Sequence, residues 1–78
     1  MQKIVYDRHA KRRMHERGVF HSEVESVMES PEYIEPSVKG RTNAFGFITG
    51  RYLRVTFREE ADVILVITVT VRKKPFKE

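Results

Sequence analysis

The sequence predicts an α+β fold in which two N-terminal helices pack on one face of an antiparallel sheet of four strands, or of five if the N-terminal segment joins the sheet. Residues 7–30 carry apolar side chains at helical spacing, and residues 33–72 change to the two-residue alternation of strands. A chain of 78 residues has room for one small core only. Residues 1–78 are therefore expected to form a single domain, with residues 73–78 as a frayed tail.

The first helix is expected over residues 7–17. Asp7 suits its N-cap, and Gly18 suits the position just after its end. On a helical wheel, Ala10 and Met14 form the only apolar stripe. A row of three basic side chains borders this stripe: His9, Arg13 and Arg17. Side chains at such a border can lay their stems on the core while their polar ends face a groove.

The second helix is expected over residues 22–30. Ser22 followed by Glu25 matches a capping box, and Pro31 ends the helix. Its apolar face consists of Val24, Val27 and Met28, and its glutamates are expected to face away from the core.

The strands are expected at residues 33–38, 44–48, 51–58 and 63–72, and residues 3–6 form a further short strand or an extended lead-in. The side chains expected to face the helices are Leu53, Val55, Phe57, Leu65, Ile67 and Val69. Those expected on the opposite, open face are Tyr52, Arg54, Thr56, Arg58, Thr68, Thr70 and Arg72. This set holds three arginines and no acidic residue.

Such a face has two interpretations. Guanidinium groups can hold a phosphodiester, and with an acid and a base in reach they can promote attack of a ribose 2′-hydroxyl on the adjacent phosphate. Alternatively, the polar side chains solvate the exposed side of a two-layer fold.

Charge is segregated along the chain. Residues 19–38 contain five glutamates and neither lysine nor arginine, whereas the flanking segments are basic and the net charge is +4. A basic surface suits a polyanion such as a nucleic acid.

Several classes of site are not expected. The chain has no cysteine, and its three histidines lack the spacing of a metal site, so no metal is predicted. No glycine loop for a nucleotide is present, and no cofactor is predicted. The longest apolar stretch, residues 63–71, is too short to span a bilayer, so no membrane association is expected and the protein is predicted to be cytoplasmic.

Among the histidines, His9 is the best acid or base, because it lies one helical turn before Arg13. His15 and His21 are expected to be surface residues. Two aromatic residues, Tyr6 and Tyr33, are assigned to the core. Three others are assigned either to packing or to stacking on bases: Phe45, Phe47 and Tyr52.

The motifs HAKRRMHERGV, HSEVESVMESPEYIE and GRYLRVTFREEADVILVITV resemble the small prokaryotic family catalogued as domain of unknown function 4258, over residues 6–71. That family looks related to the RelE/ParE/BrnT superfamily of toxins, in which two helices pack on an antiparallel sheet and some members cleave RNA to a cyclic phosphate. The resemblance assigns five residues to a phosphate-handling surface: His9, Arg13, Arg17, Arg54 and Arg58. The chain departs from the family pattern at Thr70, where ITVT replaces ITVY.

We therefore expect a RelE-like toxin domain of a toxin–antitoxin system, acting as a metal-independent endoribonuclease on RNA, free or on the ribosome, and bound by a cognate antitoxin. The catalytic residues would be His9, Arg13, Arg54 and Arg58. The RNA-binding residues would be Arg17, Tyr52, Thr68, Thr70 and Arg72. The alternatives are a nucleic-acid-binding module without catalysis, and a protein-interaction domain of the same fold.

Overall fold

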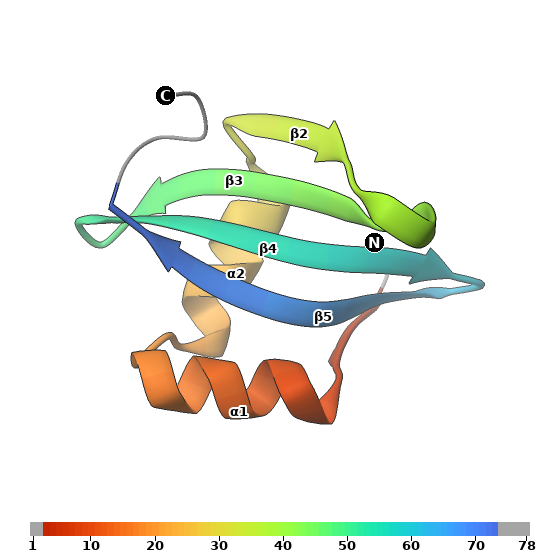
Figure 1. The fold of residues 1–78 in the computed structure, drawn as a ribbon, viewed down its shortest axis with the longest axis horizontal. Coiled ribbons are helices and arrows are strands. Elements are labelled where there is room, and N and C mark those ends of the chain that lie inside the picture. Colours follow the sequence, from red (N-terminus) through yellow and green to blue (C-terminus); the bar gives the residue numbers. More distant parts are fainter. Residues whose placement is uncertain (1–2, 74–78) are drawn as a thin grey trace.

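The computed structural model describes residues 3–73. Five strands form one sheet in the order β1-β5-β4-β3-β2, and two helices lie against it (Figure 1). The elements in chain order are β1 (Lys3–Tyr6), α1 (Arg8–Arg17), α2 (His21–Glu29), β2 (Tyr33–Pro36), a 3₁₀ turn (Val38–Gly40), β3 (Thr42–Ile48), β4 (Arg51–Glu60) and β5 (Val63–Arg72). Of the expected frayed tail, residues 74–78 lie outside the described residues.

The α+β class is confirmed, but the prediction of a purely antiparallel sheet is wrong for one pair of strands. β1 joins the sheet as its fifth strand and runs parallel to β5, with Tyr6 beside Val66. A parallel pair needs a long connection between its strands, and here every other element of the fold lies between them. The sheet is therefore mixed.

The two helices occupy different positions relative to the sheet. α2 lies behind the sheet and contacts β3 and β4, whereas α1 runs along β5 (Figure 1). The backbone N–H of Asp7 donates to the carbonyl of Val66 at 3.0 Å, and the Arg17 guanidinium donates to the carbonyl of Val69 at 2.6 Å. Since β1 pairs only with residues 63–66, α1 covers the part of the β5 edge that β1 leaves free.

The ends of α1 match the prediction. The carboxylate of Asp7 accepts a hydrogen bond from the backbone N–H of His9, and Gly18 adopts the left-handed conformation with φ of 65°. α2 starts one residue earlier than predicted, with Phe20 at its N-cap, and the Glu23 carboxylate accepts from the Phe20 backbone N–H at 2.8 Å. The predicted pairing of Ser22 with Glu25 is therefore replaced by that of Phe20 with Glu23.

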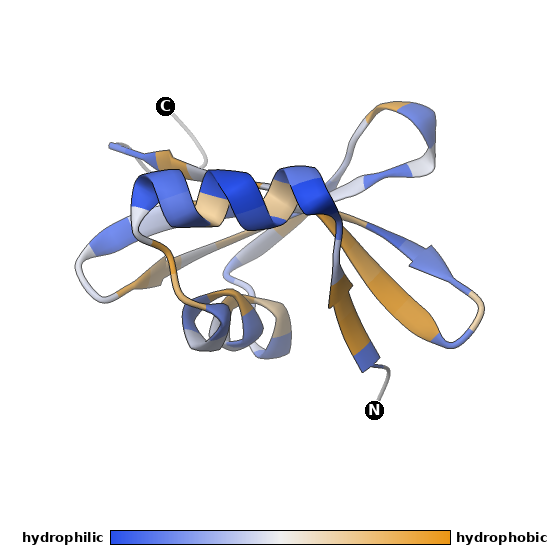
Figure 2. Cartoon of the chain, turned by 90° about the horizontal axis from the view of Figure 1, so that it is seen from below, coloured by the Kyte–Doolittle hydropathy of each residue, from blue (hydrophilic) through white to orange (hydrophobic). Residues whose placement is uncertain are grey.

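The core lies between the helices and the near face of the sheet. Its buried members are Ala10, Met14, Val19, Val24, Val27, Ala44, Leu53, Val55, Phe57, Val66 and Val69. Figure 2 shows α1 as hydrophilic over most of its surface, while the apolar residues concentrate in the strands. The alternation predicted for β4 is confirmed, because Leu53, Val55 and Phe57 all face the helices.

A β-bulge reverses the predicted alternation in the first half of β5. Thr56 pairs with Thr68, but the next residue, Phe57, pairs with Val66, so Ile67 is the extra residue. Val69 therefore faces the core as predicted, whereas before the bulge Val66 takes that position. The prediction that Leu65 and Ile67 face the helices is wrong, because an extra residue shifts the two-residue period by one.

The bulge predicts an order of stability effects. Val66→Ala should lower the free energy of unfolding by about 2 kcal/mol, because it leaves a cavity at a fully buried site. Ile67→Ala should cost less than Val66→Ala, since the Ile67 side chain is partly exposed and lies outside the buried core. Urea unfolding of both variants checks this; a larger loss for Ile67→Ala would place the bulge elsewhere.

A polar cluster joins the helical layer to the β3–β4 hairpin. The Arg51 guanidinium donates to the carbonyls of Arg17 and Gly18, each at 3.0 Å, and pairs with the Glu23 carboxylate at 3.2 Å. The hydroxyl of Thr49 also donates to Glu23. Thr49 has φ of 48°, a strained conformation for a β-branched residue, and this hydrogen bond offsets the strain. The prediction that the α2 glutamates face away from the core is wrong for Glu23, which is only 6% exposed.

These partners favour the ionised form of Glu23. The Phe20 N–H lowers its pKa most, followed by the Thr49 hydroxyl, and burial opposes them. The stability that comes from a lowered carboxyl pKa is fully present above the ordinary value of 4.5 and is lost as the pH falls through the folded value.

Glu23→Gln should therefore lower the free energy of unfolding at pH 7 by about 1–3 kcal/mol, because the charged partner of Arg51 is lost. The variant should also lose part of the decline in stability that the parent protein shows below pH 4.5. Chemical denaturation from pH 7 to pH 3 measures both effects, with the exposed Glu25→Gln as control. An equally steep decline in Glu23→Gln would contradict the assignment.

Candidate nucleic-acid interface

The face of the sheet away from α2, here called the open face, combines side chains from β2 to β5. Strand register groups its side chains into four rows that run across the strands. The first row is Phe47, Tyr52 and Arg72, and the second is Tyr33, Phe45, Arg54 and Thr70. The third row is Glu35, Asn43, Thr56 and Thr68, and the fourth is Arg58 with Leu65. All seven residues predicted for this face from β4 and β5 lie on it. Residues from β2 and β3 complete it.

The centre of the open face is a buried hydrogen-bonded row. The Thr56 hydroxyl donates to the side-chain carbonyl of Asn43 at 2.7 Å, and the Asn43 amide donates to the Glu35 carboxylate at 3.4 Å. Asn43 and Thr56 are 8% and 7% exposed. Because these polar groups satisfy one another, this row supports the surface and is not free to bind a ligand.

Aromatic side chains fill one end of the open face. Phe45 is 3% exposed, and its ring lies 5.8 Å from that of Tyr33 and 5.6 Å from the Arg72 guanidinium carbon. Phe45 and Tyr33 therefore pack on the open side of the sheet, so the assignment of Tyr33 to the core is wrong. Phe47 is 50% exposed and lies 4.8 Å from the Tyr52 ring, so this pair is the one accessible for stacking.

The three arginines of the open face have different partners. Arg54 donates one long hydrogen bond of 3.4 Å to the Thr70 hydroxyl, and its Nε is buried without a partner among the described residues. Arg58 forms an ion pair with Glu60, and Arg72 lies over Phe45. The expectation of a face free of acidic residues is wrong, because β2 contributes Glu35 and the extended β4 contributes Glu60. Neither acid could be assigned to this face from the sequence, because the pairing of β2 with β3 places Glu35 there and the length of β4 places Glu60 there.

The predicted row on α1 lies beside the open face. Lys11 and His15 line a groove together with Phe20 and His21, so this side of α1 faces α2. By helix geometry, His9 and Arg13 lie on the other side, toward the open face. The contacts of Asp7 with Val66 and of Arg17 with Val69 show that α1 advances in the same direction as β5. The α1 row, which consists of His9, Arg13 and Arg17, thus runs alongside the open-face residues of β5, which are Thr68, Thr70 and Arg72.

The members of the α1 row are engaged to different degrees. His9 is exposed, and its backbone N–H donates to the Asp7 carboxylate at 3.3 Å. Arg13 pairs with Glu16 at 3.2 Å, and both side chains are nearly half exposed. Arg17 donates to the Val69 carbonyl and therefore has a structural role in holding α1 on β5.

The other group with a shifted pKa lies on the helix side of the sheet. The Tyr6 ring stacks on His21 with centroids 4.3 Å apart, and burial, followed by the charge of Glu25, raises the pKa of Tyr6 to about 12. Tyr6 packs against the core as predicted, and His21 is an exposed surface residue as predicted.

Two further observations concern the part of the chain that the structure describes. No group of three or more histidine or acidic side chains gathers there as a metal ion would require. None of its helices is long and apolar enough to cross a membrane.

Comparison with known proteins gives one match. The family model of a domain of unknown function (DUF4258) matches residues 6–71. No curated protein and no solved structure matches the chain.

Proposed function

Because this protein belongs to the family of the domain of unknown function DUF4258, which we infer to be related to the RelE/ParE/BrnT toxins, we propose that it is a cytoplasmic toxin-type domain that binds RNA on its open face and cleaves it. In this proposal a cognate antitoxin neutralises the protein, and RNA, free or on the ribosome, is the substrate. Catalysis needs neither a metal ion nor a cofactor.

One observation carries the proposal: the α1 row and the open face border the same stretch of β5. A phosphodiester lying along this stretch would have Arg54 on one side and Arg13 on the other. Arg54 favours this position, because its hydrogen bond to Thr70 is long, at 3.4 Å, and its guanidinium carries further donors that a phosphate oxygen can accept from.

The reaction follows from the groups present. The ribose 2′-oxygen attacks the adjacent phosphorus, its proton passes to a base, and the 5′-oxygen leaves with a proton from an acid. The products are a 2′,3′-cyclic phosphate and a 5′-hydroxyl. Arg13, Arg54 and Arg58 would stabilise the additional negative charge in the transition state. His9 would serve as the acid or the base in one of the two proton transfers. Thr70, which stands where the family pattern has a tyrosine, accepts a hydrogen bond from Arg54 and so orients its guanidinium.

A second candidate is a nucleic-acid-binding module without catalysis. It is favoured by the ion pairs of Arg13 with Glu16 and of Arg58 with Glu60, which neutralise two of the proposed catalytic cations. Binding through Arg54, Arg72 and the Phe47–Tyr52 pair would remain. The interpretation as a protein-interaction domain predicts no RNA affinity at all.

The first test addresses RNA binding. Changing Arg54 and Arg58 together to Ala should weaken binding to a single-stranded RNA and reduce the slope of log K against log salt by about 1.4, since each lost phosphate contact removes about 0.7. Fluorescence anisotropy at several salt concentrations measures both.

The control is the double variant Lys11→Ala, Lys39→Ala, which removes the same charge from exposed positions outside the predicted surface. It should leave the slope nearly unchanged. Equal slopes for a folded Arg54→Ala, Arg58→Ala variant and its parent would exclude the open face as the RNA site.

The second test separates an enzyme from a binding module. His9→Ala should lower the cleavage rate by roughly 10² to 10⁴ while leaving RNA affinity nearly unchanged. The melting temperature should also stay unchanged, because the imidazole is exposed and alanine suits a helix. Cleavage is followed by the appearance of 5′-hydroxyl and cyclic-phosphate ends.

His15→Ala, on the α2 side of the same helix, is the matched control and should retain the parent rate. If His9→Ala and His15→Ala cleave equally fast, His9 is not the acid or base. If the parent protein binds RNA but produces new ends neither in free RNA nor in messenger RNA on the ribosome, the binding module is the correct function.

A further inference from the structure

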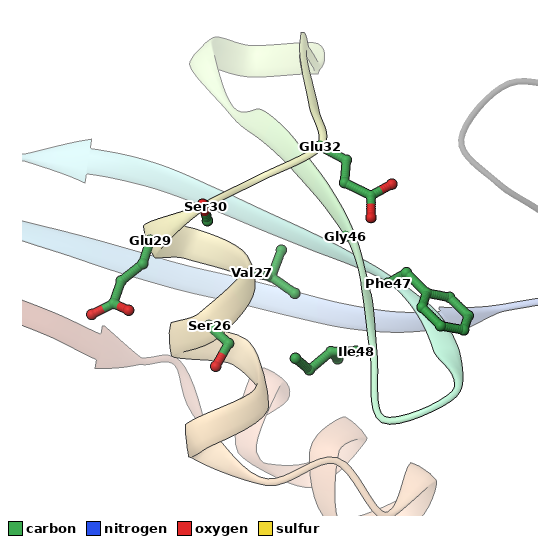
Figure 3. A pocket seen from close by; sticks show the side chains of 8 residues that line it. All are labelled: Ser26, Val27, Glu29, Ser30, Glu32, Gly46, Phe47 and Ile48. Atoms are coloured by element: carbon green, nitrogen blue, oxygen red, sulfur yellow. The ribbon is translucent and has the colours of Figure 1, made fainter.

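A second surface lies on the helix side of the sheet, beyond α2. A groove of about 360 Å³ runs between the second half of α2 and β3, lined by Ser26, Val27, Glu29, Ser30, Glu32, Gly46, Phe47 and Ile48. Figure 3 shows the side chains of Val27 and Ile48 in the space between α2 and β3. The Phe47 ring lies on the other side of β3, and the Glu32 carboxylate lies above that ring in this view.

The groove exists because the helical layer is incomplete. α1 lies along β5 and α2 contacts β3 and β4, so no described helix covers the near face of β2. Ile34, which pairs with Ala44 on this face, is 54% exposed. Gly46 lets α2 approach β3, since an added Cβ would lie 3.1 Å from a methyl group of Val27. A two-layer fold normally buries such an apolar sheet face under a helix.

The electrostatic surroundings of the groove are negative. Glu32 lies at its mouth, and Glu29 lies in the last turn of α2 with its carboxylate turned away from the groove. The C-terminal end of α2 adds the negative end of the helix dipole, and its last turn contains no basic residue. Residues 19–38 contain no lysine or arginine at all, in a protein with a net charge of +4.

We propose that this groove binds an amphipathic helix of a partner protein that carries lysine or arginine beside its apolar stripe. The apolar stripe would cover the exposed parts of Ile34 and Ile48, completing the helical layer, while the cations would approach Glu32 and the end of α2. The proposal is independent of RNA binding, because it uses the opposite side of the sheet.

The test uses a synthetic helical peptide of about 18 residues, long enough to hold a helix, with leucines on one face and lysines on the other. Two further peptides serve as comparisons: one of the same composition in scrambled order, and one with glutamate replacing lysine. The amphipathic lysine peptide should bind, and its backbone-amide NMR shifts should map to α2, β2 and β3. Because the protein is itself cationic, binding of this peptide requires a locally acidic site.

Charge-removing variants show whether the acidic rim contributes. Glu29→Gln with Glu32→Gln should weaken binding of the lysine peptide about 2- to 10-fold, because Glu32 at the mouth of the groove loses its charge contact and Glu29 adds only a nearby charge that points away. The matched control, Glu59→Gln with Asp62→Asn, removes the same charge from exposed positions around the β4–β5 turn and should leave the affinity unchanged.

An apolar variant tests the uncovered near face of β2, where Ile34 pairs with Ala44. Ile34→Ser should weaken binding about 3- to 10-fold, as expected from half of a buried isoleucine surface. Val38→Ser, at a residue that is 67% exposed in the 3₁₀ turn, is its control. Equal affinity for all three peptides, equal effects of test and control variants, or NMR shifts confined to the open face would each overturn the proposal.

Discussion

The ion pair between Arg51 and Glu23 connects the turn between the two helices to the β3–β4 hairpin. Arg51 also holds the last carbonyls of α1, and Glu23 holds the first N–H of α2, so one pair fixes the sharp turn between the helices and ties it to the β3–β4 hairpin. A small domain with few apolar residues gains specificity from such a cluster, because the buried carboxylate has satisfied partners in only one arrangement. The cluster holds the C-terminal end of α1, while Asp7 and Arg17 bind α1 to the β5 backbone.

The β-bulge in β5 has a comparable influence on the two faces of the sheet. By inserting Ile67, it turns Val66 toward the helices and leaves Thr68 and Thr70 on the open face. A regular strand would have to place either Val66 or Val69 outside the core. The bulge therefore allows a strand that is apolar in its first half and polar in its second to serve both as a core element and as a functional surface.

The two proposed surfaces divide the charge of the protein between opposite sides of one sheet. The open face and the bordering row of α1 are cationic, although Glu16, Glu35 and Glu60 moderate their charge. The groove beside α2 is apolar with acidic surroundings. Phe47 borders both surfaces, since it contacts Tyr52 and lines the groove.

The sequence by itself determined the helices, their caps at Asp7 and Gly18, the alternation in β4 and the seven open-face residues of β4 and β5, because these features depend on local spacing. Only the tertiary structure decided the parallel pairing of β1, the extra residue at Ile67, the burial of Glu23 and the position of Glu35 beside Asn43. Each of these depends on a partner distant in the chain, and neither periodicity nor composition specifies which strand, or which register, supplies that partner.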